Sequence, residues 1–325
     1  MAPTRIDGFD LLRGIAVGLV ILRHALPTPF AGAGVVGVVM FFALSGHLIT
    51  GLLLGETDLR RFYRRRVRRL LPALLFLLAG VSLVTLLLDP LGDRDELIKT
   101  LVVALTWTAD LPFGHASDAT FHLWTLAVEE QFYLVWPVLL VWAVRRGLVG
   151  AALVAAGAGC ALACVGTVWW AGAAPDVAYS LPTSWAGCFV IGAASRVYAD
   201  RIVVPRWAAP TALALLAVLA VIPLRGHALT YLAGGPAIAA LTAVLLLSWR
   251  TWTDVTSSAL RGLVWLGTVS YAAYLWNYPL TLWLRPYVDG AGLLAAGLTI
   301  AMAALSWHLV EKHVQRRTAP VAVSA

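Results

Sequence analysis

Long apolar segments alternate with short polar ones along almost the whole chain. Windows of roughly 20 residues, the length of helix that crosses a bilayer core, are bounded by charged residues, proline or glycine. Each window predicts a membrane-spanning helix. The predicted spans are 11–29, 34–54, 70–88, 123–144, 148–171, 183–199, 207–224, 231–249, 263–284 and 291–311. The pattern therefore predicts an all-α, polytopic membrane protein with about ten transmembrane helices, as one domain over residues 1–317 followed by a short tail over 318–325.

A further apolar segment, 97–112, is shorter and carries Lys99, Asp110 and Pro112. A segment of this length is more typical of a re-entrant or interfacial helix than of a span. We therefore expect it to enter the membrane without crossing it.

Basic residues are distributed unevenly between the two sides of this topology. If the N-terminus is cytoplasmic and 97–112 does not cross, all but five of the 24 lysines and arginines lie on the cytoplasmic side. The positive-inside rule requires this asymmetry. It predicts that both termini, and with them the tail, are cytoplasmic. The five basic residues on the opposite side are Arg23, Arg94, Lys99, Arg225 and Arg285.

The composition supports the membrane class. Hydrophobic residues make up 60% of the 325 residues, charged residues 13%, and the mean hydropathy is +0.82. A soluble domain is about half apolar and a quarter charged, so a cytosolic enzyme is excluded. The net charge of +7 reports topology, not nucleic-acid binding. Arginine greatly outnumbers lysine, and alanine, glycine and valine are abundant, which is typical of a GC-rich bacterial genome. We therefore expect the chain to lie in a bacterial inner membrane.

Known soluble-enzyme motifs do not occur in the sequence. It contains no P-loop, HExxH, GxSxG or paired CxxC motif, so ATP hydrolysis, zinc chemistry and a nucleophilic serine have no support, and no metal is expected. The three cysteines, Cys160, Cys164 and Cys188, lie in apolar segments. Such a set favours apolar packing over a disulfide framework.

The first predicted span carries Arg13 and His24, eleven residues apart. This spacing places both on one helix face, about 16 Å apart along the axis. Arg13 is then at the cytoplasmic interface and His24 deep in the membrane. Ionisable residues within spans are usually functional, and histidine is the natural general base near neutral pH. The alternative is a buried histidine satisfied by hydrogen bonds.

The segment LRRFYRRRVRRLLP, residues 59–72, places Arg66 and Arg69 on one helix face with Arg65 beside them. Such a basic segment is also typical of a topological stop signal or of binding to anionic lipid headgroups. Arginine makes bidentate contacts with phosphate. The cluster therefore fits the phosphates of a nucleotide-bearing cofactor at the cytoplasmic side.

The segment HLWTLAVEEQFYLVWP, residues 122–137, carries Glu129 and Glu130 into an apolar span. Two buried carboxylates need a polar cavity or a cation, so Glu129 is expected to pair with His24 or with an arginine. Trp124 falls at the outer interface, where tryptophan is also ordinary belt material.

Two further spans carry polar residues at helical spacing. Ser45 precedes Gly46, a small pair that allows another backbone to approach closely. Ser270, Tyr274 and Asn277 keep one polar face, with Tyr271 beside it, which predicts a lined cavity. Ser45, Tyr271 and Asn277 are candidate hydrogen-bond donors to a substrate or oxyanion. Together with Trp124, they are the predicted substrate-binding residues.

With these motifs in view, the chain resembles the integral-membrane acyltransferase-3 family over almost its full length. Ordered blocks carry the resemblance: RIDGFDLLRGIAVGLVILRH, GVVMFFALSGHLIT, FYRRRVRRLLP, WTLAVEEQFYLVWP and SYAAYLWNYP. The resemblance implies that His24 is the base, Arg13 its motif partner and Glu129 the buried carboxylate. It also implies that Arg66 and Arg69 bind the cofactor. One position departs: the last block usually ends in a histidine, and here the residue is Asn277, which cannot titrate.

The resemblance implies acyl transfer, with acetyl as the expected group, from acyl-CoA to a hydroxyl of a carbohydrate-containing acceptor. The acceptor is a cell-surface polysaccharide, a lipid-linked glycan or the sugar of a secondary metabolite such as a macrolide. No permanently bound cofactor is expected, and general-base and acyl-histidine mechanisms both stay open. Members often carry an added extracytoplasmic domain, and this chain is expected to act without one. The alternative function is a transporter of a lipid-linked sugar or small metabolite. The sequence shows no inverted pair of broken helices, and this speaks against a transporter.

Overall fold

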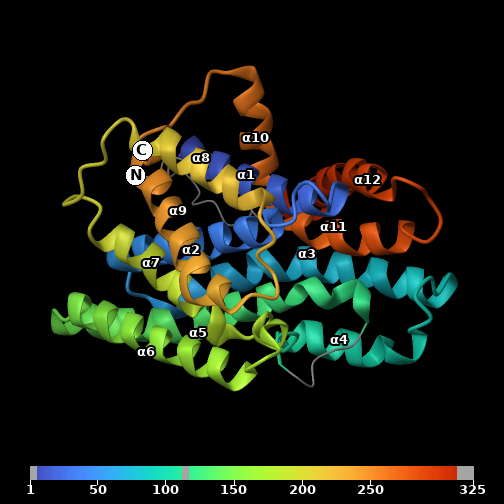
Figure 1. The fold of residues 1–325 in the computed structure, drawn as a ribbon, viewed down its shortest axis with the longest axis horizontal. Coiled ribbons are helices and arrows are strands. Elements are labelled where there is room, and N and C mark those ends of the chain that lie inside the picture. Colours follow the sequence, from blue (N-terminus) through green and yellow to red (C-terminus); the bar gives the residue numbers. More distant parts are fainter. Residues whose placement is uncertain (1–5, 112–116, 313–325) are drawn as a thin grey trace, which may run out of the picture.

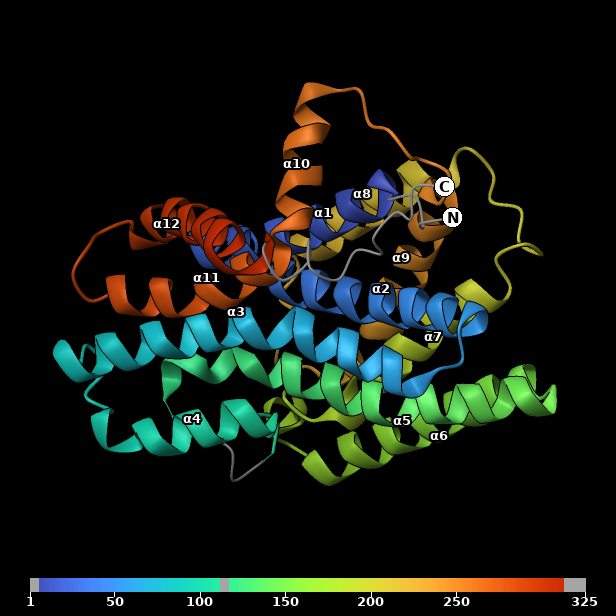
Figure 2. The same cartoon turned by 180° about the vertical axis from the view of Figure 1, so that it is seen from behind.

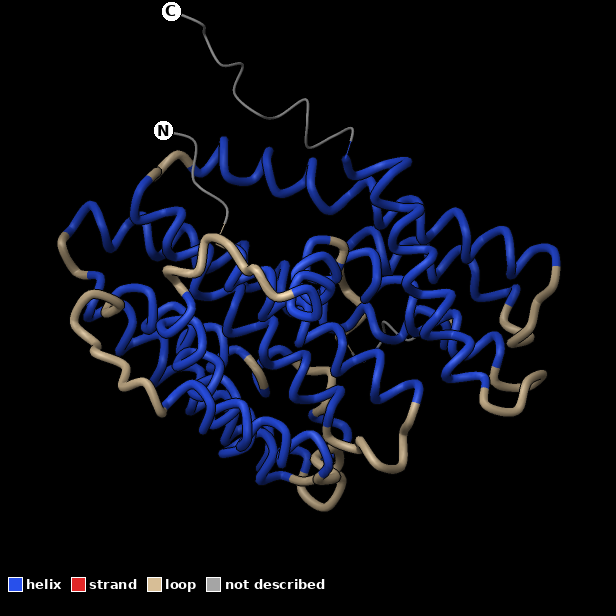
Figure 3. Tube along the Cα trace, turned by 90° about the horizontal axis from the view of Figure 1, so that it is seen from above, coloured by secondary structure: helices blue, strands red, loops and turns tan. Residues whose placement is uncertain are grey.

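The computed structural model describes residues 6–111 and 117–312, and every regular element among them is helical. Helices α2, α3, α5 and α6 run alongside one another, whereas α10 turns across them (Figures 1 and 2). Loops join the helices, many of them at the edges of the molecule in the view of Figure 3. The predicted tail, 318–325, and Pro112 lie outside the described residues.

The α-helices are α1 (Asp7–Ala25), α2 (Ala33–Gly55), α3 (Leu59–Leu87), α4 (Leu97–Thr106), α5 (Trp124–Arg146), α6 (Val149–Ala171), α7 (Ala186–Val197), α8 (Ala208–Val221), α9 (Gly235–Trp249), α10 (Ser258–Thr268), α11 (Ser270–Leu284) and α12 (Ala291–Ser306). The short 3₁₀ or π segments are η1 (Arg94–Glu96), η2 (Asp118–Leu123), η3 (Pro175–Ala178), η4 (Pro182–Ser184), η5 (Thr230–Gly234) and η6 (Trp307–Glu311).

Six helices within the described residues are long and apolar enough to cross a membrane. They are Ala33–Gly55, Leu59–Leu87, Asp118–Arg146, Val149–Ala171, Thr230–Trp249 and Ala291–Glu311. The all-helical, multi-pass membrane class is therefore confirmed, while the predicted count of ten is not.

The other four predicted spans do not meet this length and composition, each for an identifiable reason. Helix α1 has 19 residues but carries four charged side chains. Helices α7 and α8 have 12 and 14 residues, short of the roughly 20 that cross a bilayer. The predicted span 263–284 is wrong as a single helix, because the chain breaks at Val269 between α10 and α11.

Close backbone contact with α1 accounts for the position of α10. A Cβ atom added at Gly267 lies 1.8 Å from the carbonyl oxygen of Asp10, and one added at Gly14 lies 1.9 Å from that of Leu263. Only glycine allows two backbones to approach this closely. The apolar pattern of 263–284 does not reveal this contact, and it therefore predicts one continuous span.

The segment predicted not to cross contains η1 and α4. Helix α4 has 10 residues, about half the length of a span, and ends at Trp107 in a left-handed conformation. Just beyond it, both carboxylate oxygens of buried Asp110 accept hydrogen bonds from Gln131 Nε2, at 3.0 and 2.9 Å. These contacts fix the segment against α5.

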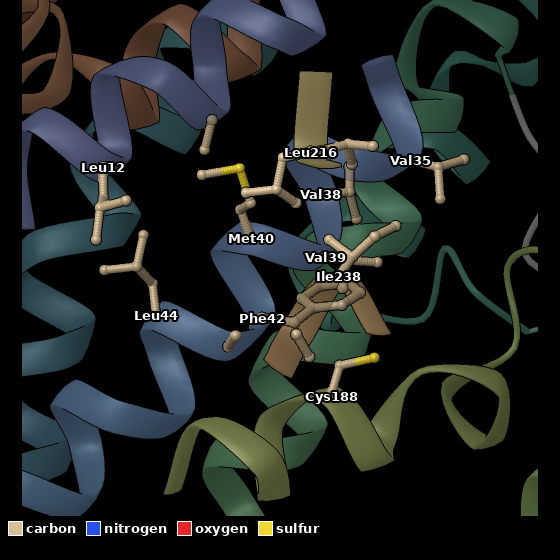
Figure 4. Packing of buried hydrophobic residues seen from close by; sticks show 14 of the residues in the cluster. Leu12, Val35, Val38, Val39, Met40, Phe42, Leu44, Cys188, Leu216 and Ile238 are labelled. Carbon is tan, nitrogen blue, oxygen red and sulfur yellow. The ribbon is translucent and has the colours of Figure 1, made fainter. Parts of the chain in front are cut away.

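Helix α2 lies at the centre of the main apolar core. Phe42 of α2 stacks on Phe189 of α7 with ring centroids 4.5 Å apart, and Figure 4 shows it among Ile238 and Cys188. The expected close approach at Gly46 is confirmed, because a Cβ there lies 2.0 Å from the carbonyl oxygen of Phe189. Cys160, Cys164 and Cys188 are free thiols in apolar surroundings.

Candidate active site

Two cavities follow one another along the helices that carry the predicted motifs. The larger, of about 370 Å³, is called the arginine cavity. The smaller, of about 230 Å³, is called the histidine cavity. The arginine cavity is lined by residues that include Arg13, Ser45, Arg65, Arg66, Arg69, Glu129 and Tyr271. The histidine cavity is lined by residues that include Arg23, His24, His122, Trp124, Arg225, Tyr278 and Arg285.

Three residues, Val38, Thr125 and Tyr274, line both cavities. The hydroxyl oxygens of Thr125 and Tyr274 lie 2.6 Å apart. Both hydroxyls also lie within hydrogen-bonding distance of the backbone carbonyl oxygen of His122, at 3.1 and 3.0 Å. This pair of side chains therefore forms the wall between the two cavities.

The two charged residues of α1 lie in different cavities. Arg13 and His24 both face the interior, as their spacing predicted, but Arg13 lines the arginine cavity and His24 the histidine cavity. Arg13 Nη1 donates a hydrogen bond to Asp10 Oδ1 at 2.7 Å. Eleven helical residues separate them by about 16 Å along the axis, so Arg13 is not in direct contact with His24.

Glu129 is the centre of the polar network in the arginine cavity. Its Oε1 accepts hydrogen bonds from Ser45 Oγ at 2.5 Å, from Arg66 Nη2 at 3.1 Å and from the hydroxyl of Tyr133. Arg66 also lies 3.7 Å from Glu130 and stacks over the Tyr133 ring, 3.6 Å from its centroid. Of the two expected partners for Glu129, the structure selects an arginine.

Among the described residues, Glu129 therefore pairs with Arg66, whereas His24 is bonded to Asn277. Glu129 lies more than one turn along α5 from Trp124, which lines the histidine cavity, and its carboxylate points into the other cavity. Ser45 is held by that carboxylate. Tyr271 lines the arginine cavity with a buried hydroxyl that has no hydrogen-bond partner among the residues the structure describes. Neither Ser45 nor Tyr271 lies beside His24.

The arginines predicted to bind a cofactor differ in how far they are neutralised. Arg66 faces two carboxylates, and its side chain is only 13% exposed. Arg65 forms an exposed ion pair with Glu56 at 3.0 Å. Arg69 is exposed at the mouth of the cavity and makes no hydrogen bond or ion pair with another described residue. Arg69 is therefore the arginine of this group with a guanidinium free for an anion.

A chain of hydrogen bonds fixes the orientation of His24. Thr299 Oγ1 donates to the Ala295 carbonyl oxygen at 2.7 Å, so it accepts from Asn277 Nδ2 at 3.2 Å. The amide oxygen of Asn277 then faces His24 Nδ1 at 2.5 Å. An amide oxygen only accepts, so Nδ1 carries the proton and Nε2 keeps its lone pair. Asn277 thus acts on His24 without titrating.

Aromatic side chains complete the histidine cavity. The Tyr278 ring lies edge-on to His24, with centroids 5.3 Å apart, and stacks against His122 at 5.2 Å. Trp124 is 3% exposed and packs beside Tyr179, with centroids 5.0 Å apart. The predicted position of Trp124 at a substrate cavity is consistent with this lining.

Sequence reasoning did not identify His122 and Tyr278, which line this cavity, or Thr299, which binds Asn277 behind His24. His122 Nε2 lies 3.0 Å from the carbonyl oxygen of Leu275 and joins η2 to α11. Thr299 could have been singled out from the sequence, because it is a polar residue in the middle of the apolar helix α12. Its partner in another helix could not be read from that position.

This arrangement defines a class of protein. A basic cavity, and beyond it a histidine bonded through Nδ1 to Asn277, fit a group-transfer enzyme among helical membrane proteins. The sequence model of a family described as an acyltransferase domain matches residues 6–311. The chain therefore belongs to the acyltransferase-3 family, as its motifs indicated, and its enzyme class is an acyltransferase of groups other than amino-acyl groups.

The curated relatives are named as O-acetyltransferases. The chain is 30% identical over 349 residues to the putative peptidoglycan O-acetyltransferase YrhL of Bacillus subtilis strain 168, an alignment that covers 95% of this chain and 55% of the relative. It is 36% identical over 159 residues to the O-acetyltransferase OatA of Staphylococcus aureus strain NCTC 8325, covering 45% of this chain and 26% of the relative. The chain thus spans about half of YrhL and about a quarter of OatA. No solved structure matches the chain significantly.

Proposed function

We propose that this chain is a membrane O-acyltransferase that moves an acyl group, with acetyl expected, from acyl-CoA to a hydroxyl of a glycan-containing acceptor. The observation that carries the proposal is the pair of cavities with a common wall. The arginine cavity offers at its mouth a cation that no described residue pairs with, and the histidine cavity offers a basic nitrogen with a fixed lone pair. The names of the relatives support an acetyl group and a glycan acceptor.

The arginine cavity suits the donor. The phosphates of coenzyme A meet Arg69 and Arg65 at the mouth, where arginine gives bidentate, charge-assisted contacts. The narrow pantetheine arm then passes inward along the cavity, which is lined by apolar side chains of α2 and α5 beyond its arginines. Arg66, held by Glu129 and Glu130, shapes the cavity and supplies little free charge.

The histidine cavity suits the acceptor. His24 Nε2 removes the proton of the acceptor hydroxyl, whose oxygen attacks the thioester carbonyl carbon. The resulting tetrahedral intermediate breaks its carbon–sulfur bond, and the departing thiolate takes the proton from the imidazolium. General-base catalysis of this kind contributes about 10²–10⁴-fold. The acyl group must pass Thr125 and Tyr274, so this wall opens during the cycle.

The membrane orientation follows the same logic. Arg145 and Arg146 lie in the last turn of α5, and Arg196 in the last turn of α7 lies against Gly51 of α2, next to a residue that lines the arginine cavity. By the positive-inside rule this end of the helices faces the cytoplasm, the source of acyl-CoA. We propose that the chain lies in a bacterial inner membrane with both ends of the chain in the cytoplasm.

The proposal is tested by release of free coenzyme A from acetyl-CoA by purified protein, with a crude glycan extract as acceptor. His24→Ala should abolish release while the protein stays folded. His47→Gln is the matched control, because His47 is a buried histidine bonded to Ser195 at 2.8 Å and lines neither cavity. A fully active His24→Ala variant contradicts the mechanism. If the wild-type protein neither releases coenzyme A nor binds acetyl-CoA, the enzyme assignment is contradicted and a transporter is favoured.

A further inference from the structure

Three basic residues that run against the charge asymmetry gather at one place. Of the five basic residues on the side expected to carry few, Arg94 and Lys99 are paired locally. Arg94 lies 3.9 Å from Asp89 and Lys99 lies 3.4 Å from Glu96. The remaining three, Arg23, Arg225 and Arg285, all line the histidine cavity. They come from α1, from the loop after α8 and from the end of α11, so they are far apart in the sequence.

One of the three is neutralised and held in place. Arg225 makes two hydrogen bonds to the Asp176 carboxylate, at 2.8 and 3.1 Å, which lower the pKa of that carboxyl below its usual range. Its guanidinium also lies 4.5 Å from the centroid of the Tyr179 ring. Arg225 is therefore a fixed part of the cavity rim, with its charge compensated by Asp176.

The other two carry uncompensated charge. Arg23 is half-buried and Arg285 is exposed, and neither forms an ion pair with another residue that the structure describes. Among the described residues, no aspartate or glutamate lines this cavity. The histidine cavity thus presents two free guanidinium groups beside the His24 imidazole. Ion pairs among the described residues therefore do not account for Arg23 and Arg285.

The aromatic walls describe the rest of the ligand. Trp124, Tyr179 and Tyr278 line the same cavity as the arginines. Flat aromatic faces pack against the apolar face of a sugar ring, while guanidinium forks bind carboxylate or phosphate. A neutral sugar can pack against the aromatic faces but has no anionic group for the guanidinium groups to bind.

We infer that the histidine cavity selects an acceptor that carries an anionic group, a carboxylate or a phosphate, close to the hydroxyl that is acylated. Arg23 and Arg285 bind the anion, and Arg225 holds the rim. This inference rests on the proposed function, whose acceptor class it narrows. The same two arginines would also attract the headgroup of an anionic lipid, and the experiment separates the two sources.

The test measures binding to purified protein in phosphatidylcholine nanodiscs. The probes are a trisaccharide of glucuronic acid and the same trisaccharide with its carboxylates reduced to hydroxymethyl groups. Wild type should bind the acidic probe about 10- to 100-fold more tightly, the range of one or two charge-assisted contacts. The double variant Arg23→Gln/Arg285→Gln should lose this difference. The control Arg94→Gln, which removes a paired arginine outside the cavity, should keep it.

A second variant acts in the opposite direction and so excludes misfolding as the cause. Asp176→Asn leaves Arg225 uncompensated, and it should tighten binding of the acidic probe while the neutral probe is unaffected. Equal binding of the two probes, or binding of neither, overturns the inference. Loss of the preference when phosphatidylglycerol is added to the nanodiscs also overturns it, because the site then belongs to lipid. Release of coenzyme A in the same nanodiscs reports separately on the proposed function.

Discussion

The hydrogen-bond chain behind His24 makes a quantitative prediction for Thr299. In Thr299→Val the side chain keeps its shape but loses the oxygen that accepts from Asn277 Nδ2. The amide donor is then buried without a partner, which costs about 1–3 kcal/mol. The amide relieves this cost by turning its nitrogen toward His24. The imidazole then carries its proton on Nε2 and cannot act as a base.

The expected effect is on turnover and not on donor binding. A preference of this size corresponds to a factor of about 5 to 150 in the population of the active tautomer, so kcat should fall within that range. The KM for acetyl-CoA should stay unchanged, because coenzyme A is assigned to the other cavity. Initial rates of coenzyme A release at saturating acceptor measure both quantities.

Two controls isolate the effect. Thr299→Ser keeps the hydroxyl and should retain most activity. Thr242→Val removes an equally buried threonine that bonds Ile238 in α9 in the same way, at 2.8 Å, but lines neither cavity. It should leave kcat unchanged. Wild-type turnover in Thr299→Val would refute the assignment of the His24 tautomer.

Three further predictions concern the arginine cavity and the α1–α10 contact. Glu129→Gln leaves the buried Arg66 poorly compensated, so it should lower the free energy of unfolding by about 2–3 kcal/mol. The loss is measured as a lower melting temperature in detergent. Arg65→Gln, at an exposed ion pair, should change the free energy of unfolding by less than about 1 kcal/mol. Arg69→Gln should raise the KM for acetyl-CoA about tenfold with kcat retained, whereas Arg61→Gln, outside the cavity, should leave KM unchanged. Gly267→Ala places a methyl group 1.8 Å from an α1 carbonyl oxygen and should sharply reduce the yield of monodisperse protein in size-exclusion chromatography. An unchanged KM for acetyl-CoA in the Arg69 variant would contradict the proposal that Arg69 binds the phosphates of coenzyme A.

The parts of the site that depend on one helix were predictable from the sequence. The spacing of Arg13 and His24 follows from the helical period alone, and both side chains face the interior. The basic segment of α3 follows from its composition, and three of its arginines line a cavity. The need of Glu129 for a cation follows from the cost of burying charge. Periodicity and desolvation act within a single segment, so one sequence suffices to read them.

The parts that depend on two helices were not predictable. Which cation meets Glu129, and which residue meets His24, depends on the rotation and depth of neighbouring helices. The break at Val269 depends on the contact of α10 with α1. The number of apolar residues in the segment does not predict this contact. The arginines of the histidine cavity were visible only as exceptions to the charge rule. Their common position appears once three distant segments are packed together.

The central claim is that the two cavities are the donor and acceptor halves of one reaction path, and an experimental structure with bound acetyl-CoA tests it most directly. The account predicts coenzyme A phosphates at Arg69 and the thioester carbonyl carbon past Thr125 and Tyr274. That carbon should lie where an acceptor hydroxyl bonded to His24 Nε2 can reach it within about 3–3.5 Å. Coenzyme A bound outside the arginine cavity, or arriving from the side of Arg225 and Arg285, would contradict the account.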